Sequence, residues 1–230
     1  MKHTILVPLD GSTLAERALP YAEVLARPGG GQLALVRAVP YLAHPEHQGP
    51  TATLAAARAA ASAEARAYLE EQAAGARRRG MPATIAVPQE DEADGILAEA
   101  RRAGADLIAM ATHGRGGLGR VVYGSVAQEV LARTALPTLI VRAWLPENGA
   151  ALLANHPRIL VPLDGSAASE AILPLAHGLA EDLGGRLILL RAVARPDLAF
   201  APDFLAGPLL RDELAAERAA AEVYLREVAA

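Results

Sequence analysis

Short apolar runs alternate with longer helical patterns along residues 1–142. This alternation is typical of a parallel β-sheet flanked by helices. The sequence therefore predicts an α/β, doubly wound domain. The predicted strands lie within residues 4–9, 32–39, 81–87, 105–111 and 136–142. The predicted helices lie within residues 13–26, 51–79, 91–104 and 125–134. Thr13 and Glu16 are expected to form a capping box at the start of the first helix.

The chain repeats part of this pattern. ILVPLDGS at 5–12 returns at 159–166, and LALVRAV at 33–39 returns as LILLRAV at 187–193, both displaced by 154 positions. The second copy reads as strand, helix, strand and helix, and it contains no counterpart of the later strands. It is therefore an incomplete copy of the first domain.

The repeat predicts the domain organisation. We expect a complete domain at 1–142, a linker at 143–157 and a truncated second domain at 158–230. Two strands and two helices cannot bury both apolar faces of such strands alone. The second copy is thus expected to dock on the first domain or on another chain, giving a homo-oligomer such as a dimer. The alternative is that the second copy is partly disordered.

Composition excludes several classes of function. The 22 basic and 26 acidic side chains leave a net charge of −4, which does not favour nucleic acid or an anionic membrane surface as a partner. The absence of cysteine excludes disulfides, thiolate metal sites and thiol catalysis. No stretch is long and apolar enough for a signal sequence or a membrane span. We therefore expect a globular, cytoplasmic protein.

A glycine-rich segment, ATHGRGGLGRVVYGSV at 111–126, follows the fourth predicted strand. Strand-to-helix turns of a parallel sheet meet at one edge, so this segment is expected to lie near the DGS turn that follows the first strand. Glycines let the backbone N–H groups approach an anion, and a helix that starts at Gly124-Ser125 favours negative charge. A phosphate group is the expected ligand.

Two common phosphate-binding motifs do not fit. A Walker A loop needs a lysine, and the only lysine of the chain is Lys2. A dinucleotide fingerprint would follow the first strand, where LDGSTL contains a single glycine.

Three separated motifs resemble the universal stress protein family, in its ATP-binding branch: ILVPLDGS, ADLIAMATHGRGGLGRVVYGSVAQEVL and LPTLIVR. The resemblance covers residues 1–142 and, as a half copy, 158–230, so it indicates a tandem form with a truncated second copy. It implies a five-stranded parallel sheet with strand order 3-2-1-4-5, like that of the adenine-nucleotide alpha-hydrolases. It also implies ATP with Mg²⁺ as the bound group.

The resemblance implies a set of nucleotide-binding residues. Pro8, Leu9 and Asp10 would lie near the ribose and phosphates, with Asp10 as a ligand of the nucleotide's Mg²⁺. Ala38 would offer its backbone to the adenine edge. The set is completed by Met110, Ala111, Gly114, Gly124, Ser125 and Val126. Ala111 stands where the family pattern has its first glycine, and the added methyl group either is accommodated or crowds the ligand.

Several of these residues have a purely structural alternative. Ser125 is expected to cap its helix, in a capping box with Gln128, with or without a phosphate contact. Asp10 either contacts the ligand or only holds the turn, and its repeat Asp164 favours the turn role. Arg37 and Arg191 end apolar strands, where they either reach the crevice or pair with an acid.

Histidines and arginines of the loops also have either a ligand-binding or a purely structural role. His113 is expected to be part of the turn, because no serine–histidine–carboxylate arrangement is visible. Arg115 and Arg120 either bind phosphates or face water. His44 and His47 are expected to be loop residues without a metal.

Three functions compete at this point. The first is a stress-response protein that binds ATP with Mg²⁺ and acts as a nucleotide-dependent regulatory and dimerising module, with no catalytic residue assigned. The second is a slow ATPase or an adenylate-handling enzyme. The third is a structural dimerisation protein in which Ala111 closes the site and the fifth strand is the pairing edge. Fold alone does not decide among them.

Overall fold

The computed structural model describes residues 3–40, 51–112, 124–146, 148–193 and 203–230. The chain divides into two compact units, Met1–Ala154 (unit 1) and Asn155–Ala230 (unit 2).

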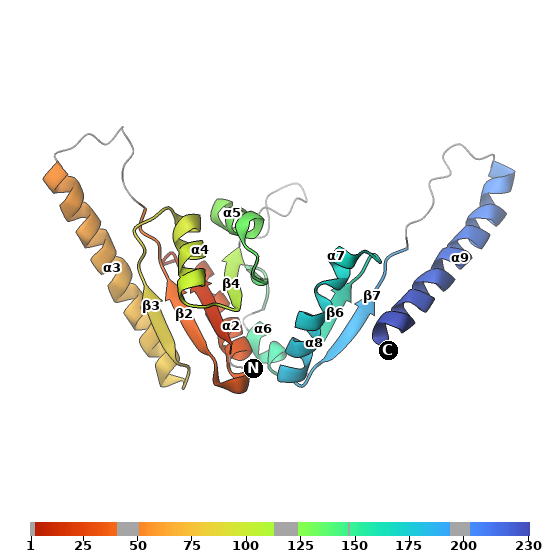
Figure 1. Ribbon diagram of the computed structural model, residues 1–230, viewed down its shortest axis with the longest axis horizontal. Helices are drawn as coiled ribbons and strands as arrows, with labels where there is room; N and C mark the ends of the chain where they lie inside the picture. The colour runs from red at the N-terminus through yellow and green to blue at the C-terminus, as the bar shows by residue number, and fades with distance from the viewer. Residues whose placement is uncertain (1–2, 41–50, 113–123, 147, 194–202) are drawn as a thin grey trace. The chain divides into compact units, whose positions relative to one another are not determined.

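Unit 1 contains a five-stranded parallel sheet with the order β3-β2-β1-β4-β5 (Figure 1). Its strands are β1 (Thr4–Pro8), β2 (Gln32–Val36), β3 (Ala83–Ala86), β4 (Leu107–Thr112) and β5 (Thr138–Arg142). Its helices are α1 (Thr13–Glu16), α2 (Ala18–Ala26), the short 3₁₀ helix η1 (Pro28–Gly30), α3 (Thr51–Arg78), α4 (Glu92–Arg102), α5 (Ser125–Arg133) and α6 (Gly149–Leu153). The fold class and the strand order are confirmed.

Helices cover both faces of this sheet. On one face, Leu6 of β1 and Ile108 of β4 are fully buried against α4 and α5, which contribute Ile96 and Val130 to the same core cluster. On the other face, α2 packs on β1, β2 and β4, and α3 packs on β2 and β3. Successive residues of a strand point to opposite faces, so both faces of the central strands are apolar.

The helix predicted at 13–26 is interrupted at Arg17. Pro20 has no N–H, and its ring conflicts with the carbonyl four residues earlier, so the first helical segment ends at Glu16. Unit 2 has the same break, where Pro174 lies four residues beyond Glu170, the last residue of its first helix.

The capping box predicted for Thr13 and Glu16 is wrong. Ser12 is the N-cap of α1, and its hydroxyl accepts a hydrogen bond from the N–H of Ala15 at 3.1 Å. The Glu16 carboxylate instead accepts hydrogen bonds from Tyr68 and Gln72 of α3. Tyr68, which is 52 positions away in the sequence, thus binds the carboxylate that was expected to contact the backbone of Thr13.

Unit 2 is built from β6 (Arg158–Pro162), α7 (Ala167–Glu170), α8 (Leu173–Asp182), β7 (Arg186–Leu190) and α9 (Asp203–Ala229). Its two strands pair in parallel, and α8 packs on both of them. Val161 and Leu163 are buried in its core cluster, which Tyr224 of α9 also contacts. The other face of the two-stranded sheet exposes Leu160, Ile188 and Leu190.

Residues 143–157, predicted as a linker, include α6. This helix packs against α2, and its Ala150 is buried. The boundary between the units lies after α6, between Ala154 and Asn155. In the described part of the chain, no helix has the length and apolar character needed to cross a membrane.

Candidate functional site

The carboxyl ends of β1 and β4 lie side by side in the sheet. β1 pairs with β2 on one side and with β4 on the other, where Ile5 and Leu6 are aligned with Leu107 and Ile108. The chain therefore reverses its strand order between β1 and β4. Ligands of open α/β sheets collect at this kind of switch point. Two groups of predicted site residues end up here: Pro8, Leu9 and Asp10 after β1, and Met110 and Ala111 at the end of β4.

The turn after β1 is held by its own side chains. The Asp10 carboxylate accepts a hydrogen bond from the N–H of Ser12 at 2.8 Å, while Gly11 adopts a φ of +91°, which favours glycine. In unit 2, the Asp164 carboxylate accepts from the N–H of Ser166 at 2.9 Å. Asp10 thus holds the turn, which was one of the two roles considered for it, and Asp10 is exposed at the edge of the sheet.

The environment of this turn favours the ionised carboxylate. Partial burial raises the pKa of Asp10, but hydrogen bonds from Ser12 and the charge of Arg37 outweigh it, so the pKa lies below its ordinary value of 3.8. In unit 2, hydrogen bonds from Ser166 and Ser169 lower the pKa of Asp164 to about 2. Asp10 is therefore fully charged at neutral pH.

Stability is expected to fall in acid because of these two carboxylates. A pKa that is lower in the folded state contributes stability above the unfolded value of 3.8, and this contribution is lost as the pH drops toward 2. Urea unfolding followed through this pH range should show the loss in both units. Asp164→Asn should flatten the pH dependence of unit 2 and leave that of unit 1 unchanged. An unaltered slope for unit 2 would show that Asp164 does not contribute.

The backbone of Ala38 faces the site. Arg37 and Val39 donate their N–H groups to Ala86 (3.2 Å) and Pro88 (2.9 Å) on the β3 side. Successive residues of an extended strand direct their backbone groups to opposite neighbours, so the N–H and C=O of Ala38 face the β1 side. The β1–β2 ladder has already ended there, at Pro8 and Val36. This orientation fits the adenine contact implied for Ala38.

Gly124 is the N-cap residue of α5 and makes no side-chain cap. A Cβ added to it would have no described residue within 4 Å. Ser125 is the first residue of the helix, so the capping box predicted for Ser125 and Gln128 is wrong; the N–H of Gln128 donates to the carbonyl of Gly124. The side chain of Val126 packs against the core, which leaves its backbone for any ligand.

Part of the predicted site lies outside the described residues. This holds for Gly114, a predicted nucleotide ligand, and for His113, Arg115 and Arg120 of the same glycine-rich segment. It also holds for His44 and His47.

Thr112 is a polar residue at this edge that the sequence pattern did not single out. It ends β4 and is 3% exposed, and its hydroxyl has no hydrogen-bond partner in the described structure. Threonine is common in strands, so nothing in the pattern distinguishes it. Its position as the second residue of the glycine-rich segment is the signal that could have found it.

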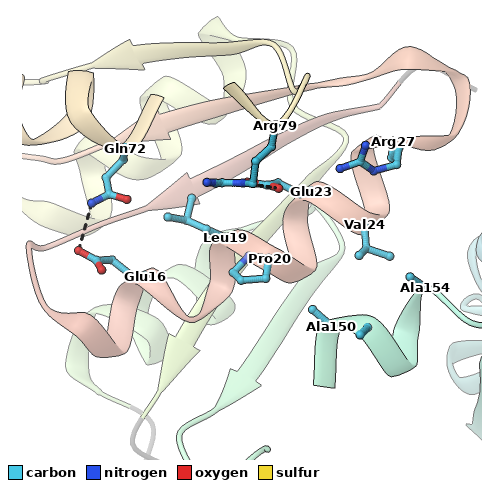
Figure 2. Close-up of a pocket in the computed structure, with 11 residues that line it drawn as sticks. Glu16, Leu19, Pro20, Glu23, Val24, Arg27, Gln72, Arg79, Ala150 and Ala154 are labelled. Carbon is cyan, nitrogen blue, oxygen red and sulfur yellow. Dashed lines mark hydrogen bonds and ion pairs between the residues drawn. The ribbon is translucent and has the colours of Figure 1, made fainter. Parts of the chain in front are cut away.

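A cavity of about 450 Å³ lies elsewhere in unit 1, between α2, α3 and α6 (Figure 2). Its walls include Leu19, Val24 and Ala150, and it contains none of the predicted nucleotide residues. The buried Glu23 carboxylate in its wall is paired with the Arg79 guanidinium, whose Nε lies 3.1 Å from both carboxylate oxygens. This pair satisfies its own charges, while Glu16 and Arg27 also line the cavity.

Comparison with known proteins decides the family. A sequence model described as the universal stress protein family matches residues 1–142. The chain belongs to the universal stress protein family. Membership supports a role in the stress response.

Relatives of this universal stress protein agree with the fold. A Thermus aquaticus protein described as a universal stress protein in the QAH/OAS sulfhydrylase 3' region is 35% identical over 153 residues, which cover 62% of this chain and all of that protein. A universal stress protein of Archaeoglobus fulgidus DSM 4304 has a TM-score of 0.67 at 19% identity, covering 86% of this chain and 70% of that one. UspA of Lactobacillus plantarum has a TM-score of 0.51 at 20% identity, covering 61% of this chain and 98% of that one.

Proposed function

We propose that unit 1 binds ATP together with Mg²⁺ at the carboxyl ends of β1 and β4, and that it acts as a nucleotide-dependent regulatory and dimerising module. The observation that carries the proposal is the switch point between β1 and β4, which brings Asp10 and Ala111 to one edge of the sheet. The N-terminus of α5 belongs to the strand-to-helix connection that follows β4, at this same edge.

The donor groups at this edge suit a nucleotide. The backbone of Ala38 would form hydrogen bonds with the adenine edge. The N–H groups at the start of α5, from Gly124 to Val126, have no partner within the helix and would bind the phosphates. Asp10 supplies a charged carboxylate. Mg²⁺ is usually held by one or two carboxylates plus phosphate oxygens. In the described ranges no three acidic or histidine side chains form a metal-binding group, which fits a cation held by Asp10 and the nucleotide itself.

Binding without rapid hydrolysis is the form we propose. A general base works best when its pKa lies near the working pH. The pKa of Asp10 is lowered, so this carboxylate is a weak base at neutral pH. When bound, Mg²⁺ would neutralise phosphate charge, and the chain's own residues would bind and orient the nucleotide.

The first test uses the purified wild-type chain. After denaturation, any released nucleotide is identified by chromatography, and ATP with Mg²⁺ is then titrated into nucleotide-free protein by calorimetry. We expect adenine nucleotide in the released fraction or saturable binding near one per chain. If no nucleotide is released and the titration gives no binding heat, the proposal is overturned. That result would favour a dimerisation role without nucleotide. Steady phosphate release that Asp10→Ala abolishes would indicate an ATPase.

We also propose that the chain forms a homo-oligomer, with a dimer as the simplest form. β5 is an edge strand of the described sheet, so one row of its backbone groups lacks a strand partner there. The exposed apolar side chains of β6 and β7 also favour self-association. Sedimentation over a range of concentrations tests this, and a monomer at all concentrations would overturn it.

A further inference from the structure

Arg37 lies directly beneath the turn that carries Asp10. It follows β2, and its Nη1 atom is 3.4 Å from the position that a Cβ of Gly11 would take. Its side chain is 25% exposed, so most of that side chain is covered. Its charge also contributes to the lowered pKa of Asp10. The guanidinium therefore supports the backbone of the turn from below.

Helix α3 holds Arg37 in this position. The guanidinium carbon lies 5.5 Å from the centre of the Tyr68 ring, and Nη2 is 3.5 Å from a carboxylate oxygen of Glu64. The Tyr68 hydroxyl donates to the Glu16 carboxylate at 3.0 Å. The turn, α1 and α3 are thus joined through one arginine and one tyrosine. A planar guanidinium stacked on a ring is more fixed than a free side chain.

Unit 2 repeats this arrangement. Arg191 lies beneath Gly165, which has a φ of +85°, and its guanidinium carbon is 4.8 Å from the centre of the Tyr224 ring. The Tyr224 hydroxyl donates to the Glu170 carboxylate at 2.8 Å. Arg191 is displaced by the same 154 positions as the rest of the repeat. Within residues 155–230, this turn support is present without a glycine-rich segment.

We infer that Arg37 is a positioning residue of the nucleotide site: it fixes the Gly11 turn so that the Asp10 carboxylate is held ready for the cation and phosphates, an inference that rests on the proposed function. Arg191 supports the equivalent turn in unit 2, where no nucleotide is proposed. Ligand groups held by packed neighbours lose less freedom on binding, which raises affinity. The two arginines thus form a matched pair within one chain.

The test compares Arg37→Met with Arg191→Met in the full chain. Methionine keeps an unbranched apolar stem and removes the guanidinium. The Kd for ATP with Mg²⁺ is measured by calorimetry, and thermal unfolding is measured in parallel. We expect Arg37→Met to raise the Kd by about 10-fold, the lower end of the effect of residues that orient a ligand group. Arg191→Met should leave the Kd unchanged. It should lower the stability of unit 2 about as much as Arg37→Met lowers the stability of unit 1.

The outcomes separate this inference from the proposed function. If the wild-type chain does not bind ATP, both are overturned. If the wild type binds and Arg37→Met binds equally well, the positioning role alone is overturned. If Arg191→Met raises the Kd as much as Arg37→Met does, the effect reflects general stability and the inference also fails. If Arg37→Met does not fold, Tyr68→Phe is compared with Tyr224→Phe instead. A Kd that is raised only in Tyr68→Phe supports the inference. Equal Kd values for the two variants overturn it.

Discussion

Gly124→Val is expected to abolish measurable binding of ATP with Mg²⁺. Gly124 is the N-cap of α5, and no described residue lies within 4 Å of the position of its added Cβ. A valine side chain would therefore occupy the place from which we propose that phosphates approach the helix N–H groups. We expect a loss of at least about 100-fold in affinity, or about 2.8 kcal/mol. Calorimetric titration of the variant beside the wild type measures it.

The fold should tolerate this substitution. The φ of Gly124 is −59°, a value that any residue adopts. Valine is a poorer N-cap than glycine, so we expect a cost of about 1 kcal/mol or less. The matched control is Gly178→Val in α8 of unit 2, where an added Cβ also meets nothing within 4 Å. Unchanged ATP binding by Gly124→Val would mean that the helix start does not contact phosphate.

Leu6→Ala is expected to destabilise unit 1 far more than Leu160→Ala destabilises unit 2. Both leucines stand at the second residue of an identical ILVP segment, aligned by the repeat. Leu6 is 0% exposed beneath α4 and α5, whereas Leu160 is 56% exposed. Truncating the buried leucine leaves a cavity and should cost about 2–5 kcal/mol. The exposed one should cost about 1 kcal/mol or less.

Each unit is followed separately in this comparison. Amide hydrogen exchange of β1 reports the unfolding free energy of unit 1, and that of β6 reports unit 2. The measurement is made at a protein concentration low enough to keep the chain monomeric, as checked by sedimentation. Equal losses for the two variants would contradict the prediction, because they would show that another surface covers Leu160 even in the single chain.

The order and type of the elements could be predicted from local patterns. The structure contains every predicted strand and helix of residues 1–142, and the strand order agrees with the family resemblance. Errors occurred where a local rule was read without its neighbours. The predicted helix at 13–26 contains Pro20, whose effect on the carbonyl of Glu16 ends the first segment. The N-cap of α5 is Gly124, one residue before the predicted cap Ser125.

The sequence could predict the positions of candidate site residues only where they lie in turns or at the ends of strands. The positions of Asp10 and Gly124 follow from a strand end and a helix start, whereas Ala111 was implied by the family resemblance; their nucleotide contacts stay a prediction. Arg37 was noticed as a strand end, but its role stayed open between the crevice and an acidic partner. The structure brings Arg37 to Glu64 and Tyr68 of α3, beside the Asp10 turn. Glu64 and Tyr68 lie far from Arg37 in the sequence, so no local pattern could have identified them as its partners.

The sequence by itself determined the local structure of both copies. ILVPLDGS forms a strand and a serine-capped turn in each, because glycine, aspartate, serine and the later proline act through the backbone within a few residues. Only the tertiary structure decided burial. Leu6 and Leu160 belong to the same octapeptide, yet one is enclosed and the other exposed, because α4 and α5 pack over the first. Burial depends on neighbours brought by distant parts of the chain, and the octapeptide contains no information about them.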